Sequence, residues 1–402
     1  MIRRVFKAFQ YRDFRLMWFG ACTSSIGTWM QIVAQGWLVY RLSNDNARLL
    51  ALDQFLGGLP IFLFSLVGGV IADRFERRKV LLGSQYVQMA SAGILTLLLI
   101  YNAVQIWEIL TLSFVSGFAQ AFGGPAYQAL IPTLVDKEDM PNAIALNSIQ
   151  FNVAVTVGPA LGGVALSNLG ETWCFFLNAL SFLAPIVALS IISTRFLPVK
   201  TGESMLTSIK EGFKFIRRQP SMEVLILLAF CMTFLSMPLR TFFPVFAKLV
   251  FHRGPETYAM FLTVLGVGSI AGSLAIASMG NYRNKGRVAL TMMICLGGGI
   301  AGFALSTKLP ISFVMLFLAG SSMMAVFTSI NSLVQLIVSN DMRGRVMSVY
   351  TFAFRGGMPM GNLLDGWLVP IFTAPVVLAV NGLLLIAAAL YFLLAHRGVA
   401  EL

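Results

Sequence analysis

Few side chains in this sequence could do chemistry, and the most unusual of them interrupt long apolar runs. Two acids and two bases do so: Asp53, Arg240, Arg355 and Asp365. An ionisable side chain at bilayer depth is costly and is by default a candidate for binding or for proton movement. Burial favours the neutral form of a carboxyl group and a nearby cation favours its charged form. An acid that alternates between dry and wet surroundings can therefore load and release a proton.

The position of each candidate along its run allows a second interpretation. Asp53, Arg240 and Asp365 stand nearer the outer end of a run, where a charge can also stay solvated at the membrane surface. Arg355 follows Asp341 by a helical distance of about 21 Å, which places it near the middle of the membrane. Uncharged polar candidates for a substrate pathway are Gln31, Asn147, Asn152, Asn178, Asn331 and Asn362.

Residues for other chemistries are missing from the sequence. The four cysteines stand singly in apolar stretches, and His252 and His396 lie near the ends of such stretches. This pattern predicts neither a metal site nor a bound cofactor. No phosphate-binding loop, zinc-hydrolase motif or serine-hydrolase motif occurs. An ATP-driven pump is thereby excluded, and an intramembrane enzyme is disfavoured.

Apolar helices must position the candidate residues. The 402 residues are 57% hydrophobic and 11% charged, with a mean hydropathy of +0.80, whereas soluble domains carry about 25% charged residues. This composition excludes a soluble enzyme, a secreted disulfide scaffold and a disordered chain. The net charge of +12 comes from short gaps between apolar runs, so it indicates contact with membrane lipid and not with nucleic acid. We predict an all-α membrane protein.

Twelve apolar runs have the length of about 20 residues that a membrane span requires. They lie near residues 16–41, 49–72, 80–101, 107–131, 142–167, 172–194, 222–249, 257–279, 288–306, 310–338, 342–370 and 374–395. The one long gap divides the chain into a six-helix bundle over 1–194, a linker over 195–221 and a second six-helix bundle over 222–402. Within the linker, apolar residues at helical spacing and a basic face predict an amphipathic helix on the membrane surface.

The distribution of basic residues predicts the orientation. With both termini on one side, that side holds 22 of the 29 Lys and Arg residues, the opposite side holds five, and two lie inside spans. Basic residues concentrate in cytoplasmic loops, so we expect both termini in the cytoplasm of a cell whose plasma or inner membrane holds the chain. We expect no cleavable signal peptide, because the first apolar run is too long.

The two halves repeat one another. Gly158 and Gly163 of the fifth run correspond to Gly361 and Gly366 of the eleventh, each pair differing by 203 in residue number. Many secondary transporters are built from such repeats, with a site near the membrane midplane; the major facilitator transporters are the standard example of this principle.

Two motifs carry a resemblance to the major facilitator superfamily along essentially the whole chain. The loop after the second run resembles that family's G-x-x-x-D-[RK]-x-G-R-[RK] motif and departs from it at Glu76. The fifth run resembles the G-P-x-x-G-G motif of drug and proton antiporters. The matching residues are Gly69, Asp73, Arg74, Arg77 and Arg78 in the loop, and Gly158, Pro159, Gly162 and Gly163 in the run.

The first residues of the chain resemble one group within this superfamily. Residues 11–18 and 27–31 are similar to the bacterial group of enterobactin exporters and macrolide efflux proteins. The fourth-run arginine of the antiporters has no counterpart, because residues 111–122 contain no Arg. In the family fold the second and eleventh spans are neighbours, which makes Asp53 the leading candidate for a proton site and Arg355 its partner or competitor.

The resemblance implies secondary active transport by alternating access. It favours proton-coupled efflux of small amphipathic molecules such as drugs or siderophores, by a chain that we expect to be a monomer. It further implies a loop latch around Asp73 that holds one side closed. Proton-coupled uptake by the same fold is the main alternative, and a channel or receptor is a weaker one. The identity of the substrate does not follow from the sequence.

Overall fold

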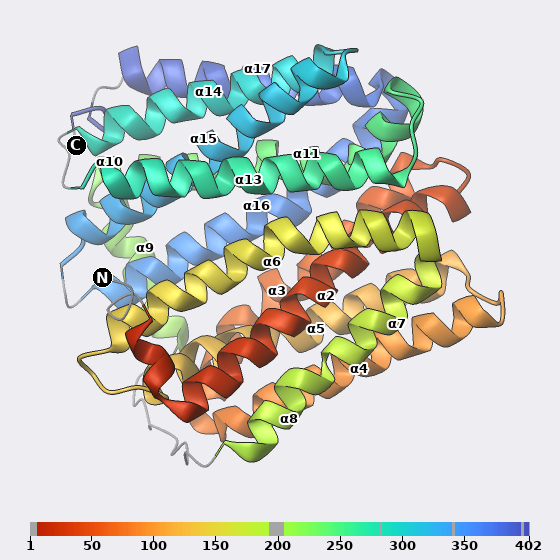
Figure 1. The fold of residues 1–402 in the computed structure, drawn as a ribbon. Helices are drawn as coiled ribbons and strands as arrows, with labels where there is room; N and C mark the ends of the chain where they lie inside the picture. The colour runs from red at the N-terminus through yellow and green to blue at the C-terminus, as the bar shows by residue number, and fades with distance from the viewer. Residues whose placement is uncertain (1–5, 193–204, 281–283, 340–341, 395–397, 402) are drawn as a thin grey trace. The chain divides into compact units, whose positions relative to one another are not determined.

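A computed structural model describes residues 6–192, 205–280, 284–339, 342–394 and 398–401. The side chains of Asp73 and of residues 205–209 lie outside this description. The predicted latch role of Asp73 therefore stays a prediction. All regular secondary structure in the described part is helical (Figure 1).

The helices of the first half follow the predicted runs closely. In chain order they are η1 (Lys7–Gln10), α2 (Arg12–Leu42), α3 (Ala47–Arg74), α4 (Arg77–Ile100), α5 (Ile106–Leu130), η2 (Ile131–Thr133), α6 (Met140–Leu169), α7 (Glu171–Ser181) and α8 (Leu183–Ile191).

The linker and the second half form the remaining helices. They are α9 (Met205–Arg217), α10 (Pro220–Ser236), α11 (Pro238–Thr241), α12 (Phe243–Val245), η3 (Phe246–Val250), α13 (Pro255–Ser278), α14 (Lys285–Leu305), α15 (Leu309–Ile337), α16 (Arg343–Phe372) and α17 (Ala374–Leu394).

Proline breaks two of the predicted runs. The sixth run divides at Phe182 into α7 and α8, with Pro185 in the first turn of α8. The seventh divides at Met237 and Phe242, with Pro238 and Pro244 just beyond. Proline has no backbone N–H and favours the first turn of a helix over its interior. Pro159 nevertheless lies inside the unbroken helix α6.

Ten helical segments of the described chain are long and apolar enough to cross a membrane. The broken sixth and seventh runs each count as one such segment. Helices α2 and α16 have the necessary length but fall outside this set. They carry more charge, including Arg355 and Asp365 on α16. For these two, crossing of the membrane stays a prediction.

The chain forms two compact units whose boundaries cut through two helices. Unit 1 comprises Met1–Asn44, Leu56–Gly202 and Pro255–Met260, and unit 2 comprises Asp45–Phe55, Glu203–Gly254 and Phe261–Leu402. The first turns of α3 therefore belong to unit 2, and the first turns of α13 belong to unit 1. In unit 1, α2 packs along α6, and in unit 2, α14 packs between α15 and α17.

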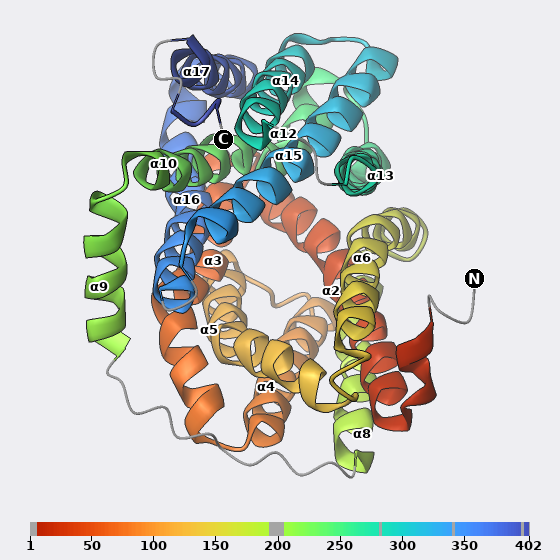
Figure 2. The same ribbon diagram turned by 90° about the vertical axis from the view of Figure 1, so that its left-hand side faces the viewer.

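The linker helix α9 docks on α16 in unit 2 (Figure 2). Glu211 pairs with Arg345 at 2.6 Å, and Gly212 lies against the backbone of Arg345. Ile216 is buried in this contact, whereas Phe213 and Lys214 face outward. Helix α9 thus buries one apolar side chain within the protein. It exposes an aromatic and basic face, as binding to a membrane surface requires.

Candidate functional site

All four predicted intramembrane charges lie in unit 2. Asp53 is only 1% exposed on α3 and Asp365 only 2% exposed on α16. Arg240 lies in the short helix α11, and Arg355 is partly buried on α16. The interfacial interpretation of the two acids is therefore wrong for their side chains in this structure, because both carboxyl groups are enclosed by protein.

Asp365 belongs to a buried polar cluster formed by α11, α16 and α17. Asn381 Nδ2 donates to Asp365 Oδ2 at 2.6 Å. One turn earlier on α16, Asn362 Oδ1 accepts a hydrogen bond from Thr241 Oγ1 at 3.0 Å. The four side chains are each 6% exposed or less. Sequence reasoning named Asp365 and Asn362 but missed Asn381 and Thr241, which nothing distinguishes from other polar residues in apolar runs.

The start of α3 is anchored near Asp53. Gln54 Nε2 donates to Asp53 Oδ2 at 3.3 Å. Ala51 lies so close to Gly366 of α16 that a methyl group added to that glycine would overlap the Ala51 Cβ. Arg48 lies 4.9 Å from the centre of the Trp367 ring. The first turns of α3 are thus held against α16 just before Asp53.

The glycine motif of α6 serves two different contacts in unit 1. Gly158 and Gly162 face α2, where a Cβ on Gly162 would lie 3.0 Å from the Met30 Cα. Gly163 faces α13, where a Cβ would overlap that of Ala259. Small residues let helix backbones approach closely. Gly163 therefore contacts the start of α13, whereas Gly158 and Gly162 pack against α2.

The arginines of the loop motif bind main-chain carbonyl groups. Arg77 donates to Ala129 O at 2.9 Å, and Arg78 donates to Ser190 O at 2.9 Å. Carbonyl groups at the ends of helices lack intrahelical partners, so these guanidinium groups cap α5 and α8. Of the other residues that match the loop motif, Arg74 is exposed and Gly69 has open space beside it. Glu76 replaces the family glycine at φ −63°, a conformation that needs no glycine.

Gln31 and Asn152, two of the uncharged candidates, differ in their surroundings. Gln31 Oε1 accepts from Asn178 Nδ2 at 2.6 Å, and Gln31 Nε2 donates to Gln35 Oε1 at 3.3 Å. Gln35 in turn donates to Ser113 at 2.8 Å, so a polar chain links α7, α2 and α5 in unit 1. Asn152 instead donates to a carbonyl of its own helix.

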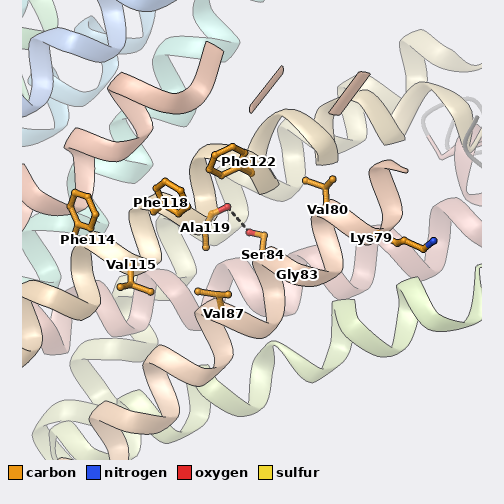
Figure 3. Close-up of a pocket in the computed structure, with 10 residues that line it drawn as sticks. All are labelled: Lys79, Val80, Gly83, Ser84, Val87, Phe114, Val115, Phe118, Ala119 and Phe122. Atoms are coloured by element: carbon orange, nitrogen blue, oxygen red, sulfur yellow. Dashed lines mark hydrogen bonds between the residues drawn. The ribbon is translucent and has the colours of Figure 1, made fainter. Parts of the chain in front are cut away.

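Two grooves provide space for a small molecule. A groove of 540 Å³ in unit 1 lies between α4 and α5 and is apolar except for Lys79 and Ser84. Figure 3 shows Phe114, Phe118 and Phe122 along one wall and Gly83 and Val87 along the other. A polar groove of 510 Å³ in unit 2 is lined by Asn331, Gln335 and Arg343, among others. Ligand sites commonly have volumes of about 300–1,000 Å³.

A clamp on the N-terminal segment was missed by sequence reasoning. Lys7 Nζ lies 2.7 Å from Asp139, and Gln10 and Tyr11 donate to the same carboxylate at 2.8 and 2.9 Å. Hydrogen bonding to Lys7 lowers the pKa of Asp139, and the same hydrogen bond raises the pKa of Lys7. The partners are far apart in the sequence, so no local pattern predicts this contact.

Comparisons with known proteins agree with the architecture. The profile of a family described as transmembrane secretion effector matches residues 4–400. The multidrug efflux pump Tap of Mycolicibacterium fortuitum is 26% identical over 87% of this chain and 88% of Tap. Macrolide efflux protein A of Streptococcus pyogenes is 23% identical over 88% of both chains. The enterobactin exporter EntS of Citrobacter koseri is 26% identical over 84% of this chain and 81% of EntS.

The solved structures extend the agreement to three dimensions. A bacterial homologue of the human lysosomal transporter Spinster, solved in an inward-facing and unoccupied conformation, superposes with a TM-score of 0.72 at 16% identity. The match covers 96% of each chain. The chain therefore belongs to the transmembrane secretion effector family and is a multi-pass membrane transporter of the major facilitator superfamily, not an enzyme.

Proposed function

We propose that this transporter exports small amphipathic molecules in exchange for protons, by alternating access across the cell membrane. Its termini face the cytoplasm in this proposal, in accordance with the distribution of its basic residues. The efflux direction is supported by the relatives, which are a multidrug pump, a macrolide efflux protein and an enterobactin exporter.

The observation that carries the coupling is the burial of Asp53 on α3 and of Asp365 on α16, at 1% and 2% exposure. A buried charge is costly unless it is paired or neutralised. A carboxyl group that becomes wet in one state of the transporter and dry in the other exchanges its proton between the two sides. Each proton that enters then drives the conformational change that carries a substrate molecule out.

The groove in unit 1 supports a substrate with apolar and polar parts. Its phenylalanine wall offers aromatic and aliphatic contacts, and its lining includes the polar groups of Lys79 and Ser84. The separate groove in unit 2 offers hydrogen bonds from Asn331 and Gln335. Small-molecule sites commonly combine an apolar lining with a few polar groups that fix orientation.

Transport by inverted membrane vesicles tests the proposal. The vesicle membranes hold the chain, a proton gradient is imposed across them, and each member of a panel of lipophilic drugs and siderophores is added outside. We expect uptake of a panel member into inverted vesicles that are acidic inside, and loss of that uptake when an ionophore collapses the gradient. Accumulation only with the opposite gradient would identify an uptake symporter, and gradient-independent equilibration would exclude coupled transport.

A further inference from the structure

The repeat within the chain shows where the two halves have diverged. The motif Gly158-Pro159-Ala160-Leu161-Gly162-Gly163 corresponds, at an offset of 203, to Gly361-Asn362-Leu363-Leu364-Asp365-Gly366. The first and last glycines are present in both copies. Two positions in between change from proline and glycine to asparagine and aspartate.

The glycines shared by the two copies make equivalent contacts. Gly163 packs against Ala259 near the start of α13, and Gly366 packs against Ala51 near the start of α3. In the same way, Gly158 faces Trp29 of α2. Its counterpart on α16 faces the backbone of α10. The two segments therefore have the same packing role, and the polar substitutions on α16 need a separate explanation.

The position of Asp365 is filled by a packing residue in the first half. Its counterpart Gly162 lies directly against the backbone of Met30. Asp365 is also buried, at 2% exposure, although it brings a carboxyl group to that position. The counterpart of Pro159 is Asn362, which is fully buried and whose Nδ2 has no hydrogen-bond partner among the described residues. A buried unsatisfied donor on the same helix face as a carboxyl group indicates a site built for more than packing.

A buried amide has likewise been retained with a different partner. Asn178 of α7 and Asn381 of α17 also differ by 203 in residue number. Asn178 donates to the neutral Gln31 at 2.6 Å, whereas Asn381 donates to Asp365 at 2.6 Å. The retained amide thus binds a neutral side chain of α2 in the first half and an ionisable side chain of α16 in the second.

The charged groups around Asp365 are few. On the elements packed against this end of α16 they are Arg240 on α11, and Arg48 and Asp53 on α3, while Arg355 lies farther along α16 itself. Arg48 lies over the Trp367 ring. Within the described part of the chain, the recorded partner of Asp365 is Asn381, and Asp365 forms no ion pair there. A buried carboxyl group without a cation is the kind of group that binds and releases a proton.

We propose that Asp365, oriented by Asn381 and flanked by Asn362, is the proton-binding site of this transporter. Asn381 occupies Oδ2, so the proton is received at Oδ1, where it converts the carboxylate to the acid with no other bond changed. The proposal rests on the proposed function of proton-coupled transport. It assigns the proton to Asp365 in place of Asp53, which sequence reasoning favoured.

The test compares three variants in proteoliposomes that hold the full-length chain, with a panel member that the wild type transports. Asp365→Asn keeps the size of the side chain and removes the titratable group, Asp53→Asn is the matched change at the other buried acid, and Asn178→Leu removes the corresponding amide of the first half. We expect Asp365→Asn to abolish uphill transport and to lose the dependence of substrate exchange on pH, while downhill exchange stays within about twofold of the wild type. Asn178→Leu, whatever its effect on the transport rate, should keep the pH dependence of exchange.

The positioning role of Asn381 has its own readout. Without the donated hydrogen bond the ionised form of Asp365 loses support, so Asn381→Leu should move the midpoint of the pH dependence of exchange to higher pH. Coupled transport that persists in Asp365→Asn overturns the inference and leaves the proposed function standing, as does loss of coupling in Asp53→Asn alone. A wild type without proton coupling instead overturns the proposed function.

Discussion

Gly366 of α16 lies directly against Ala51 of α3, and Gly163 of α6 lies in the same way against Ala259 of α13. In both pairs the alanine is the fifth residue of its helix, as the starts of α3 at Ala47 and of α13 at Pro255 show. The internal repeat therefore extends to single helix contacts. It implies that the start of each of these helices is held by a glycine that tolerates no larger side chain.

Substitution of that glycine should destabilise the protein. In Gly366→Ala the new Cβ overlaps that of Ala51, so the helices must separate at an overpacking cost of about 1–3 kcal/mol. The control is Gly298→Ala on α14, where a Cβ meets open space and alanine gains about 0.5–1 kcal/mol in helix stability. Thermal unfolding in detergent should show a lower Tm for the first variant and an unchanged or higher Tm for the second.

The pairing of Lys7 with Asp139 predicts a clamp that is insensitive to pH near neutrality. The pKa of Asp139 is lowered from its usual value of about 3.9. Its contribution to the stability of the clamp is therefore present above that value and is lost only as the pH falls through the lowered pKa. The pKa of Lys7 is raised, so its contribution to the clamp is full below about 10.4 and is lost only above the raised pKa. The clamp should hold from pH 5 to 9.

A buried cysteine reports release of this clamp. Ala8 is fully buried beside it, so an Ala8→Cys side chain should react slowly with a maleimide over that pH range. Adding Asp139→Ala should speed the reaction at least tenfold, because Lys7, Gln10 and Tyr11 lose their common acceptor. Asp136→Ala is the control, since Asp136 bonds only Tyr11 of this set. Equal labelling rates in the two double variants would contradict the clamp.

The loop motif predicts that Asp73 affects the transport rate. Asp73→Asn should leave membrane insertion and folding intact but lower the transport rate, because the resemblance gives Asp73 a latch role at a helix N-terminus that favours a carboxylate. The rate is measured in the inverted vesicles, at equal amounts of inserted protein. Asp136→Asn, the same change at an exposed residue outside the motif, serves as the control. A wild-type rate in Asp73→Asn would refute the latch.

Much of the fold follows from the sequence because apolar runs of membrane length are a strong signal. The helix boundaries agree with the predicted runs to within a few residues. What pattern reasoning missed depends on contacts between distant segments. The bond from Asn381 to Asp365, the clamp on Asp139 and the polar chain through Gln35 have no local signature, because any polar residue in an apolar run looks alike until packing selects its partner.

The burial of Asp53 and Asp365 shows the same limit. An acid near the end of an apolar run is compatible with water or with a closed pocket, and hydropathy along one helix does not distinguish the two. Only the neighbouring helices decide, since they either cover the carboxyl group or leave it open. Ala47, near the start of α3, is also buried. A cysteine that is introduced there for labelling should therefore replace an exposed neighbour of Ala47.

Labelling from each side of the membrane tests the orientation. Asn44 and Lys210 are both exposed, and the distribution of basic residues places them on opposite sides. In a chain whose native cysteines are replaced, Asn44→Cys should react with a membrane-impermeant maleimide only in intact cells, and Lys210→Cys only in inverted vesicles. Reaction of both from one side would contradict the predicted topology.

The groove between α4 and α5 gives the sharpest test of substrate contact, because α4 carries two glycines with open space beside them. Gly83 lines the groove, whereas Gly93 does not, and a Cβ on either meets no neighbour within 4 Å. Gly83→Leu therefore fills part of the 540 Å³ space without straining the helix, and Gly93→Leu adds the same side chain elsewhere on α4. If amphipathic substrates pass through the groove, Gly83→Leu should raise the KM for efflux at least fivefold, with the larger effect on bulkier substrates. Gly93→Leu should leave the KM unchanged. Equal KM values for the two variants, at equal expression and Tm, would exclude the groove from the substrate pathway.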